Sequence, residues 1–215
     1  MGRRKVVLVR NHYYHVFTRS IAEYQVFRTD REYKRMLDAL RFYRNHQPGV
    51  RFSWWLNQAL KKYTTMQTNT PRIQVLAYCL MPTHIHLFLQ QIEKNGISEF
   101  MRLVLNSYAK YFNIRTKRRG PLWESKFKNV RVETDEQALH LTRYIHLNPV
   151  SAGLVPNAED WQFSSYGEYL GNHKAEAFCE FEHVLNIVPE QYRKFVDDRK
   201  DEQRHLQILK ANLLD

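Results

Sequence analysis

Two histidines are placed where they could bind a divalent metal ion. His84 and His86 stand two positions apart in the run Thr83–Leu89, where they alternate with aliphatic residues as in a half-buried strand. Side chains two apart share one face of a strand, so both imidazoles could reach the same cation. Many such pairs are structural or merely exposed, and the spacing alone leaves both interpretations open.

A tyrosine and an asparagine one helical turn apart form the second candidate group. Tyr144 and Asn148 project from the same side of a predicted helix. A phenol with a pKa of about 10 is a weak nucleophile unless cations assist it, and a phosphodiester resists attack until a cation neutralises its oxygens. A metal ion held by His84, His86 and the Asn148 amide oxygen would meet the second need. The alternative is that Tyr144 packs in the core and Asn148 only caps the helix before Pro149.

The elements that must position these residues begin with a strand and a helix. Tyr13–Thr18 is β-branched and aromatic and predicts a strand, and Asp30 could cap a helix that runs to about Asn45. A hairpin follows, with Ile73–Cys79 as its first strand and His84–Gln90 as its second. Alternation in the first of these strands predicts that one face carries Ile73, Val75, Ala77 and Cys79.

The second half of the chain supplies two more helices and a last strand. Helical spacing predicts a helix over about 97–114, and Phe127–Val132 predicts a short strand. Thr134 and Gln137 form a capping box that opens a helix through about Leu147, which Asn148-Pro149 would close. The order strand–helix–strand–strand–helix–strand is that of an α+β, ferredoxin-like split βαβ fold with an antiparallel sheet. The interval 50–71 is helical or loop, with no role evident from the sequence.

The length of 215 residues suits one catalytic domain with an appendage. We expect the domain to span residues 1–170 and an acidic, helical extension to span residues 171–215. The net charge of +11 is unevenly spread, because residues 1–156 carry +16 and residues 157–215 carry −5. Such a basic field favours a polyanion, although a solvated basic face is the plain alternative. The cations that we expect to contact a nucleic acid are Arg19, Arg115, Lys117, Arg118, Arg119, Lys126, Lys128 and Arg131.

Several protein classes are excluded by composition. No run of about 18 apolar residues is present, so no membrane span is expected. The apolar stretch behind the basic N-terminus covers only Val6–Val9, which is too short for a signal peptide. Cys79 and Cys179 are the only cysteines, which fits the reducing cytoplasm better than a disulfide framework.

Longer motifs surround the candidate residues. The hairpin contains Leu80-Met81-Pro82-Thr83-His84-Ile85-His86-Leu87, and about sixty residues later comes Arg143-Tyr144-Ile145-His146-Leu147-Asn148-Pro149-Val150. With Tyr14-His15-Val16, the stretch 120–127 and Trp161–Tyr166, these motifs resemble the single-strand DNA tyrosine transposases that carry a His–hydrophobe–His (HUH) motif. The resemblance is strongest to their REP-associated branch and spans roughly residues 12–170.

The resemblance implies a chemistry and a set of roles. It implies a ferredoxin-like core, a divalent metal ion (Mg²⁺ or Mn²⁺), and cleavage of single-stranded DNA beside a hairpin. By position, His84, His86 and Asn148 would bind the metal. Tyr144 would attack the phosphate, forming a 5′-phosphotyrosine link and leaving a free 3′-OH that can later rejoin the strands. Relatives include monomers and homodimers, and the sequence does not choose between them.

Two other functions remain open from the sequence. A transposase-derived protein could bind repeat hairpins in DNA without cutting them. Alternatively, His84 and His86 could belong to a zinc site that activates water, although neither cysteine has an evident claim to be the third ligand, and Cys79 is expected on a buried face.

Overall fold

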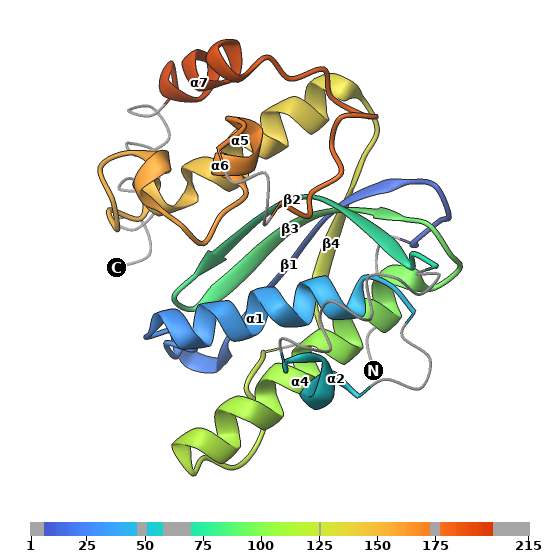
Figure 1. The fold of residues 1–215 in the computed structure, drawn as a ribbon, viewed down its shortest axis with the longest axis vertical. Helices are drawn as coiled ribbons and strands as arrows, with labels where there is room; N and C mark the ends of the chain where they lie inside the picture. The colour runs from blue at the N-terminus through green and yellow to red at the C-terminus, as the bar shows by residue number, and fades with distance from the viewer. Residues whose placement is uncertain (1–6, 47–50, 58–69, 125, 173–176, 200–215) are drawn as a thin grey trace.

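A four-stranded antiparallel sheet forms the centre of the molecule, with strand order β2-β3-β1-β4 (Figure 1). The computed structural model describes residues 7–46, 51–57, 70–124, 126–172 and 177–199. The strands are β1 (Tyr13–Arg19), β2 (Ile73–Met81), β3 (His84–Gln91) and β4 (Lys128–Val132). The longer helices are α1 (Asp30–Tyr43), α4 (Gly96–Thr116), α5 (Asp135–Ser151) and α7 (Pro189–Asp197). The shorter helical elements are α2 (Phe52–Trp55), α6 (Tyr166–Tyr169) and the 3₁₀ turns Ile21–Glu23 and Ala158–Asp160.

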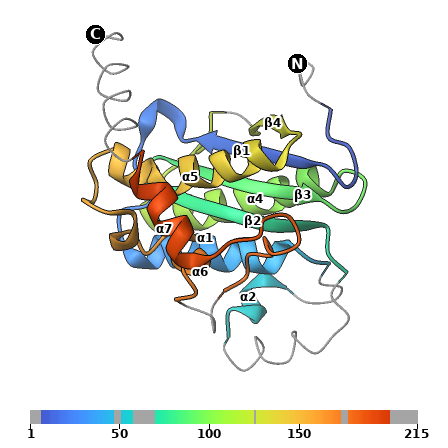
Figure 2. The same ribbon diagram turned by 90° about the horizontal axis from the view of Figure 1, so that it is seen from above.

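The helices divide between the two faces of the sheet. The crossover helices α1 and α4 pack side by side on one face, and α5 lies on the other with α6 and α7 beyond it (Figures 1 and 2). The α+β, ferredoxin-like arrangement predicted from the sequence is therefore confirmed. No helix among the described residues is long and apolar enough to cross a membrane.

A β-bulge in β2 changes which residues share a face. Val75 pairs with Leu89 and Ala77 with Phe88, so the register shifts between them. Because Leu89 and Phe88 point to opposite faces of β3, Val75 and Ala77 do too. The prediction that Ile73, Val75, Ala77 and Cys79 share one face is therefore wrong, since a bulge cannot be read from alternation.

Helix boundaries differ from the sequence predictions at two caps. The N-cap of α1 is Thr29 rather than Asp30, and the carboxylate of Glu32 accepts a hydrogen bond from the Thr29 amide. Helix α5 begins after Thr134 as predicted, with the Thr134 hydroxyl accepting from the Gln137 amide. It does not end at Asn148-Pro149, however, but continues to Ser151. A proline in the last turn removes one backbone donor, and the amides of the next residues still close the helix.

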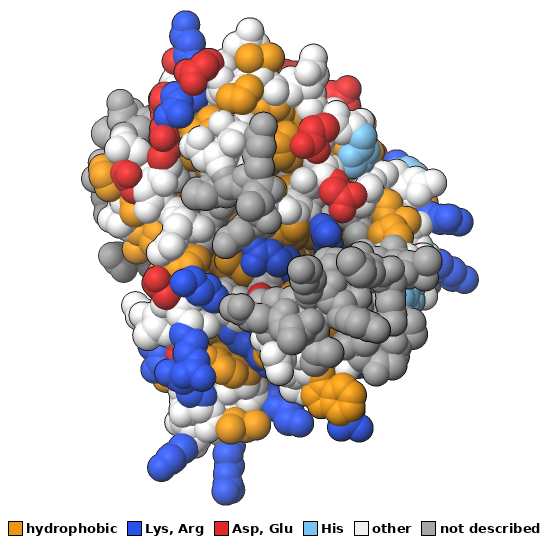
Figure 3. Space-filling view, in the orientation of Figure 1, with side chains coloured by type: hydrophobic (Ala, Val, Ile, Leu, Met, Phe, Trp, Pro, Cys, Tyr) orange, Lys and Arg blue, Asp and Glu red, His pale blue; other side chains and the backbone are white. Residues whose placement is uncertain are grey.

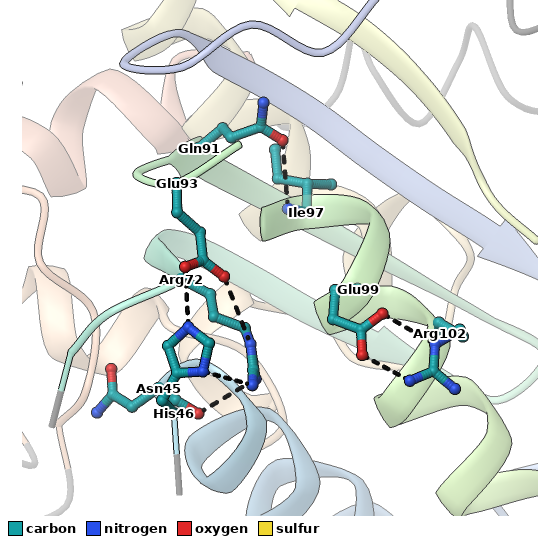
Figure 4. A network of polar contacts seen from close by, with 8 residues as sticks. All are labelled: Asn45, His46, Arg72, Gln91, Glu93, Ile97, Glu99 and Arg102. Carbon is teal, nitrogen blue, oxygen red and sulfur yellow. Dashed lines mark hydrogen bonds and ion pairs between the residues drawn. The ribbon is translucent and has the colours of Figure 1, made fainter. Parts of the chain in front are cut away.

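A polar cluster fixes the start of α4 against the sheet (Figure 4). His46 lies between Glu93 and Arg72, with its Nε2 2.8 Å from Glu93 and its Nδ1 2.9 Å from Arg72. Because the arginine can only donate, Nδ1 of His46 accepts and Nε2–H donates to the carboxylate. A Cβ on Gly96 would lie 2.3 Å from the Arg72 carbonyl oxygen, so only glycine permits this close approach.

The segment after α5 protects the outer edge of β2. The Leu80 amide donates to the Phe163 carbonyl, and the Ser165 amide donates to the Tyr78 carbonyl. Later side chains from Phe178 to Val196 join the same hydrophobic core. In the C-terminal segment that the structure describes, helix is confined to Pro189–Asp197, so the region before it is less helical than predicted. Residues 58–69 and 200–215, for which the sequence also made predictions, lie outside the described residues.

Candidate active site on the α5 face of the sheet

Pairing between strands arranges the site residues in rows across one face of the sheet. One row joins Met81, His84 and Arg19, and the next joins Cys79, His86, Phe17 and Lys128. Directly opposed residues in adjacent strands point to the same side. This side is the α5 face, because Tyr144 on α5 packs against His86 with ring centroids 5.6 Å apart.

Three histidines meet on this face. The rings of His84 and His86 are 5.0 Å apart, and those of His86 and His15 are 5.2 Å apart. His15 Nε2 lies 3.0 Å from His86 Nδ1, and His84 Nδ1 lies 2.9 Å from the Thr83 hydroxyl. Both His84 and His86 thus use Nδ1 within the protein, and Nε2 is the ring nitrogen left to each for another partner.

Burial keeps these imidazoles neutral. It lowers the pKa of His84 and of His15 to about 4, and the nearby charge of Arg19 adds to the effect at His84. The pKa of His86 is also lowered, first by burial and then by its neighbours His15 and His84. A neutral imidazole offers a lone pair, which is the form that binds a metal ion.

Tyr144 stands at the edge of the histidine cluster. Its side chain is 38 % exposed, and its ring meets His15 edge-on at 5.9 Å. The alternative that this tyrosine is a core residue is therefore wrong. Burial of the hydroxyl raises the pKa of Tyr144, while a hydrogen bond from Asn148 and the charge of Arg19 lower it. The pKa of the phenol is thus shifted in both directions, and added positive charge would lower it and favour the phenolate.

Asn148 lies inside the last turn of α5, next to the tyrosine. It is 2 % exposed, and its Nδ2 donates to the Tyr144 carbonyl over 2.7 Å. The C-cap of the helix is Ala152, so the alternative that Asn148 is the cap is wrong. With Nδ2 engaged, Oδ1 is the side-chain atom that could face a cation.

The donor types fit a catalytic divalent metal. Two imidazole nitrogens and one amide oxygen would leave several positions of an octahedral ion for water and phosphate oxygens. Mn²⁺ accepts nitrogen donors more readily than Mg²⁺, which prefers oxygen. Among the residues that the structure describes, no group of three or more His, Cys, Asp or Glu is arranged to hold a metal ion. A zinc site with three such ligands is therefore not found among the described residues.

Cys79 lies on the histidine face but does not resemble a zinc ligand. It pairs with His86 across the β2–β3 ladder and is fully buried, as predicted. Burial raises the pKa of its thiol well above the ordinary value, and the thiol donates to the Met81 sulfur over 3.7 Å. A protonated thiol is not the metal-binding form of cysteine.

The predicted DNA-contacting cations separate into groups. Arg19 and Lys128 lie at exposed positions on the α5 face, in the two rows that contain the histidines. Arg131 is opposite Tyr14, on the other face, and pairs with Glu133 at 3.4 Å. Arg115 lies in the last turn of α4, Lys117, Arg118 and Arg119 directly follow this helix, and Lys126 lies just before β4. Figure 3 shows Lys and Arg gathered on the lower part of the molecule, around α4.

The chain beyond α4 packs against the segment around the end of β1. Arg118 lies over the Tyr24 ring at 5.9 Å, and the Glu124 amide donates to the Arg19 carbonyl. In contrast, Arg115 lines a cavity of about 700 Å³ between α1 and α4, on the opposite face from Tyr144. Their contact with DNA stays a prediction, and the sequence gave no information on the face that each cation occupies.

His15 is the residue of this cluster to which sequence reasoning assigned no role. It appeared within the motif Tyr14-His15-Val16, but its partner His86 is 71 positions later. The contact depends on the β1–β3 register, which one sequence does not reveal. The signal available in the sequence was a histidine in the first predicted strand, at a position whose side chain points away from the buried face.

Comparison with known proteins identifies the family and supports the fold. The family model described as "Transposase IS200 like" matches residues 8–148. A Haemophilus influenzae protein named as a REP-associated tyrosine transposase is 26% identical over 136 residues, which cover 59% of this chain and 75% of that protein. A solved structure of a REP-associated tyrosine transposase bound to a REP hairpin aligns with a TM-score of 0.56 and 15% identity, covering 87% of this chain and 99% of that chain. The family resemblance and the fold inferred from the motifs are thereby confirmed.

Proposed function

This chain belongs to the IS200-like transposase family, and from that premise we propose that it cuts and rejoins single-stranded DNA beside a hairpin, with Tyr144 as the nucleophile. The observation that carries the proposal is the contact of an exposed tyrosine with a cluster of neutral histidines. Tyr144 packs edge-on against both His86 and His15, and Asn148 is hydrogen-bonded beside it. A nucleophile and a group of candidate metal ligands thus share one end of a sheet face.

The reaction at Tyr144 is a transesterification. The phenol oxygen attacks the phosphorus atom and loses its proton, the bond from phosphorus to the 3′ oxygen breaks, and this leaving oxygen gains a proton. The products are a 5′-phosphotyrosine and a free 3′-OH, so the energy of the phosphodiester bond is retained. Attack of a 3′-OH on this link reverses the step and rejoins strands without an external energy source.

His84, His86 and Oδ1 of Asn148 would hold the divalent ion, Mg²⁺ or Mn²⁺. When bound, such an ion supplies positive charge to the phosphate oxygens. Arg19 contributes a second positive charge, because it lies opposite His84 and lowers the pKa of Tyr144. Helix α5 holds the phenol at the cluster, and Thr83 holds the ring of His84.

The open half of the α5 face is the surface that suits the DNA strand. Helix α5 contacts β2 and β3, whereas Val130 on β4 is 53% exposed and Lys128 and Arg19 are exposed beside it. The strand would cross this half to Tyr144, and the hairpin would contact the cations at the end of α4. The solved REP-hairpin complex supports a hairpin of this kind as the partner.

A denaturing gel tests the proposal. Wild-type protein, Tyr144→Phe and His84→Ala are each incubated with hairpin DNA that carries a single-stranded flank and a 3′ label, with Mn²⁺. We expect a slow, protease-sensitive band from the wild type alone. Cleavage by Tyr144→Phe would indicate hydrolysis instead. Tight binding without cleavage under every metal would indicate a repeat-binding protein, and either result would overturn the proposal.

A further inference from the structure

His15 contacts both a predicted metal ligand and the predicted nucleophile. Its Nε2 lies 3.0 Å from His86 Nδ1, its ring stacks on His86 at 5.2 Å, and it meets the Tyr144 ring edge-on at 5.9 Å. It is carried by β1, whose pairing with β3 and β4 fixes its position from both sides. No role for this residue follows from the reaction as proposed above.

The short distance between the two imidazoles has a chemical consequence. In a hydrogen-bonded pair of neutral rings, one proton lies between the nitrogens. If His15 donated it, Nδ1 of His86 would accept and Nε2 of His86 would carry the other proton, which prevents metal binding there. If His86 donates it, Nε2 of His86 keeps its lone pair. The direction of one hydrogen bond therefore decides whether His86 can be a ligand.

We propose that His15 is a positioning residue, whose Nε2 accepts a hydrogen bond from Nδ1–H of His86 and so maintains Nε2 of His86 as the metal-binding nitrogen. This inference rests on the proposed function. A metal-binding histidine commonly donates the N–H of its other ring nitrogen to a nearby acceptor, and His15 would be that acceptor for His86. The acceptor here is a second imidazole rather than the more usual carboxylate or carbonyl.

The neighbouring histidine shows the same arrangement with a different acceptor. His84 Nδ1 lies 2.9 Å from the Thr83 hydroxyl, whose oxygen can accept a hydrogen bond from Nδ1–H. Both histidine rings of the motif thus have a hydrogen-bond partner at Nδ1, which is the adjacent Thr83 for His84 and His15 on β1 for His86. The same ring nitrogen is left free in each, as two ligands of one ion require.

Manganese binding by the intact protein is the first test. His15→Leu removes the acceptor with little change in volume, and we expect it to weaken Mn²⁺ binding by roughly 10–100-fold. His15→Gln restores an acceptor at similar reach and should bind within a few-fold of wild type. His12→Leu, the same change three residues earlier on a side chain that contacts the Arg10 carbonyl, is the control and should bind as wild type does. Thermal unfolding verifies that each variant is folded.

The proton position is the second test and needs no metal. Nitrogen-15 NMR of the histidine rings should show His86 protonated at Nδ1 in the wild-type protein and in His15→Gln, and redistributed toward Nε2 in His15→Leu. His86 protonated at Nε2 in the wild type would overturn the proposal, as would wild-type Mn²⁺ affinity in His15→Leu.

Equal losses of affinity in His15→Leu and His15→Gln would also overturn it, because that result would make His15 itself a ligand. The proposed function fails separately. If the wild type forms no DNA adduct while Mn²⁺ binding and the His86 proton respond as expected, the positioning role stands and the strand-transfer role does not.

Discussion

Neighbouring groups shift the pKa of the Tyr144 phenol in opposite directions, and Arg19 is one of the groups that lower it. Burial raises the pKa of the phenol, while the Asn148 side chain and Arg19 lower it. We expect Arg19→Leu to slow adduct formation by roughly 10²–10³-fold, the usual effect of losing one charge-stabilising group. The measurement is the single-turnover rate at saturating DNA. Arg131→Leu is the matched control, because that arginine faces the other side of the sheet and pairs with Glu133. Equal slowing of both variants would contradict the role of Arg19.

His146 makes stability depend on pH. It is fully buried between the Tyr192 and Ser165 hydroxyls, and burial lowers its pKa to about 3. Its pKa in the unfolded chain is about 6.5, so the unfolded state binds a proton first as the pH falls. The contribution of His146 is therefore complete above about pH 6.5 and is lost as the pH falls toward about 3.

Urea unfolding measures this loss. From about pH 7 to about pH 5 the wild type should lose about 2 kcal/mol more free energy of unfolding than His146→Gln, in which no group titrates at this position. An identical pH dependence in the two proteins would show that His146 is not protected from protonation in the folded state.

Residue types and spacing indicated the candidate reacting groups better than the side chains that surround them. His84, His86, Tyr144 and Asn148 were chosen as candidates because their spacing within single elements is short. His15 was missed because its contact with His86 crosses 71 residues of chain and depends on strand register. Spacing within an element can be read from one sequence, but pairing between elements cannot.

At the scale of the elements, the turn from β3 into α4 depends on a single glycine. A Cβ on Gly96 would meet the Arg72 carbonyl oxygen, and Arg72 itself contacts His46 and Glu93 (Figure 4). We expect Gly96→Ala to lower the free energy of unfolding by about 1–3 kcal/mol, because backbone must move to accept the methyl group. Chemical denaturation measures the change, with Lys94→Ala at an exposed neighbouring position as the control. Equal stability of Gly96→Ala and wild type would show that the turn can adjust at no cost.

Strands and helices were predicted from periodicity, and the errors fall where periodicity is interrupted. The four strands and the helices α1, α4 and α5 were all expected, with ends displaced by a few residues. The bulge between Val75 and Ala77 reversed the faces in half of β2. Pro149 was taken as a stop signal, but it sits in the last turn of α5. Both errors concern positions where the local pattern departs from regular periodicity.

At the scale of the whole molecule, exposed cations lie on the half of the α5 face formed by β1 and β4 and at the end of α4. Figure 3 shows Lys and Arg gathered over α1 and α4, with Asp and Glu toward α7. The overall imbalance was evident from the sequence, but its division between two faces was not. Lys128 lies in the row of His86 and Phe17, whereas Arg131, only three residues later, lies on the other face.

This distribution predicts which lysines contribute to DNA binding. Lys128→Gln should weaken hairpin binding and reduce the slope of log affinity against log salt by about 1, as expected for the loss of one phosphate contact. Lys194→Gln, the same change on the exposed side of α7, should leave the slope unchanged. Fluorescence anisotropy across a salt series measures both. An unchanged slope in Lys128→Gln, or equal changes in the two variants, would show that the strand does not cross this half of the α5 face.

The most direct test of the account is to locate the covalent bond to DNA. Wild-type protein is incubated with hairpin DNA and Mn²⁺, the adduct is trimmed with nuclease, and its peptides are sequenced by tandem mass spectrometry. We expect a nucleotide phosphate on the peptide that contains Tyr144, at the phenol oxygen. Attachment at another side chain, such as the exposed Tyr24, or strand cleavage with no modified peptide, would contradict it.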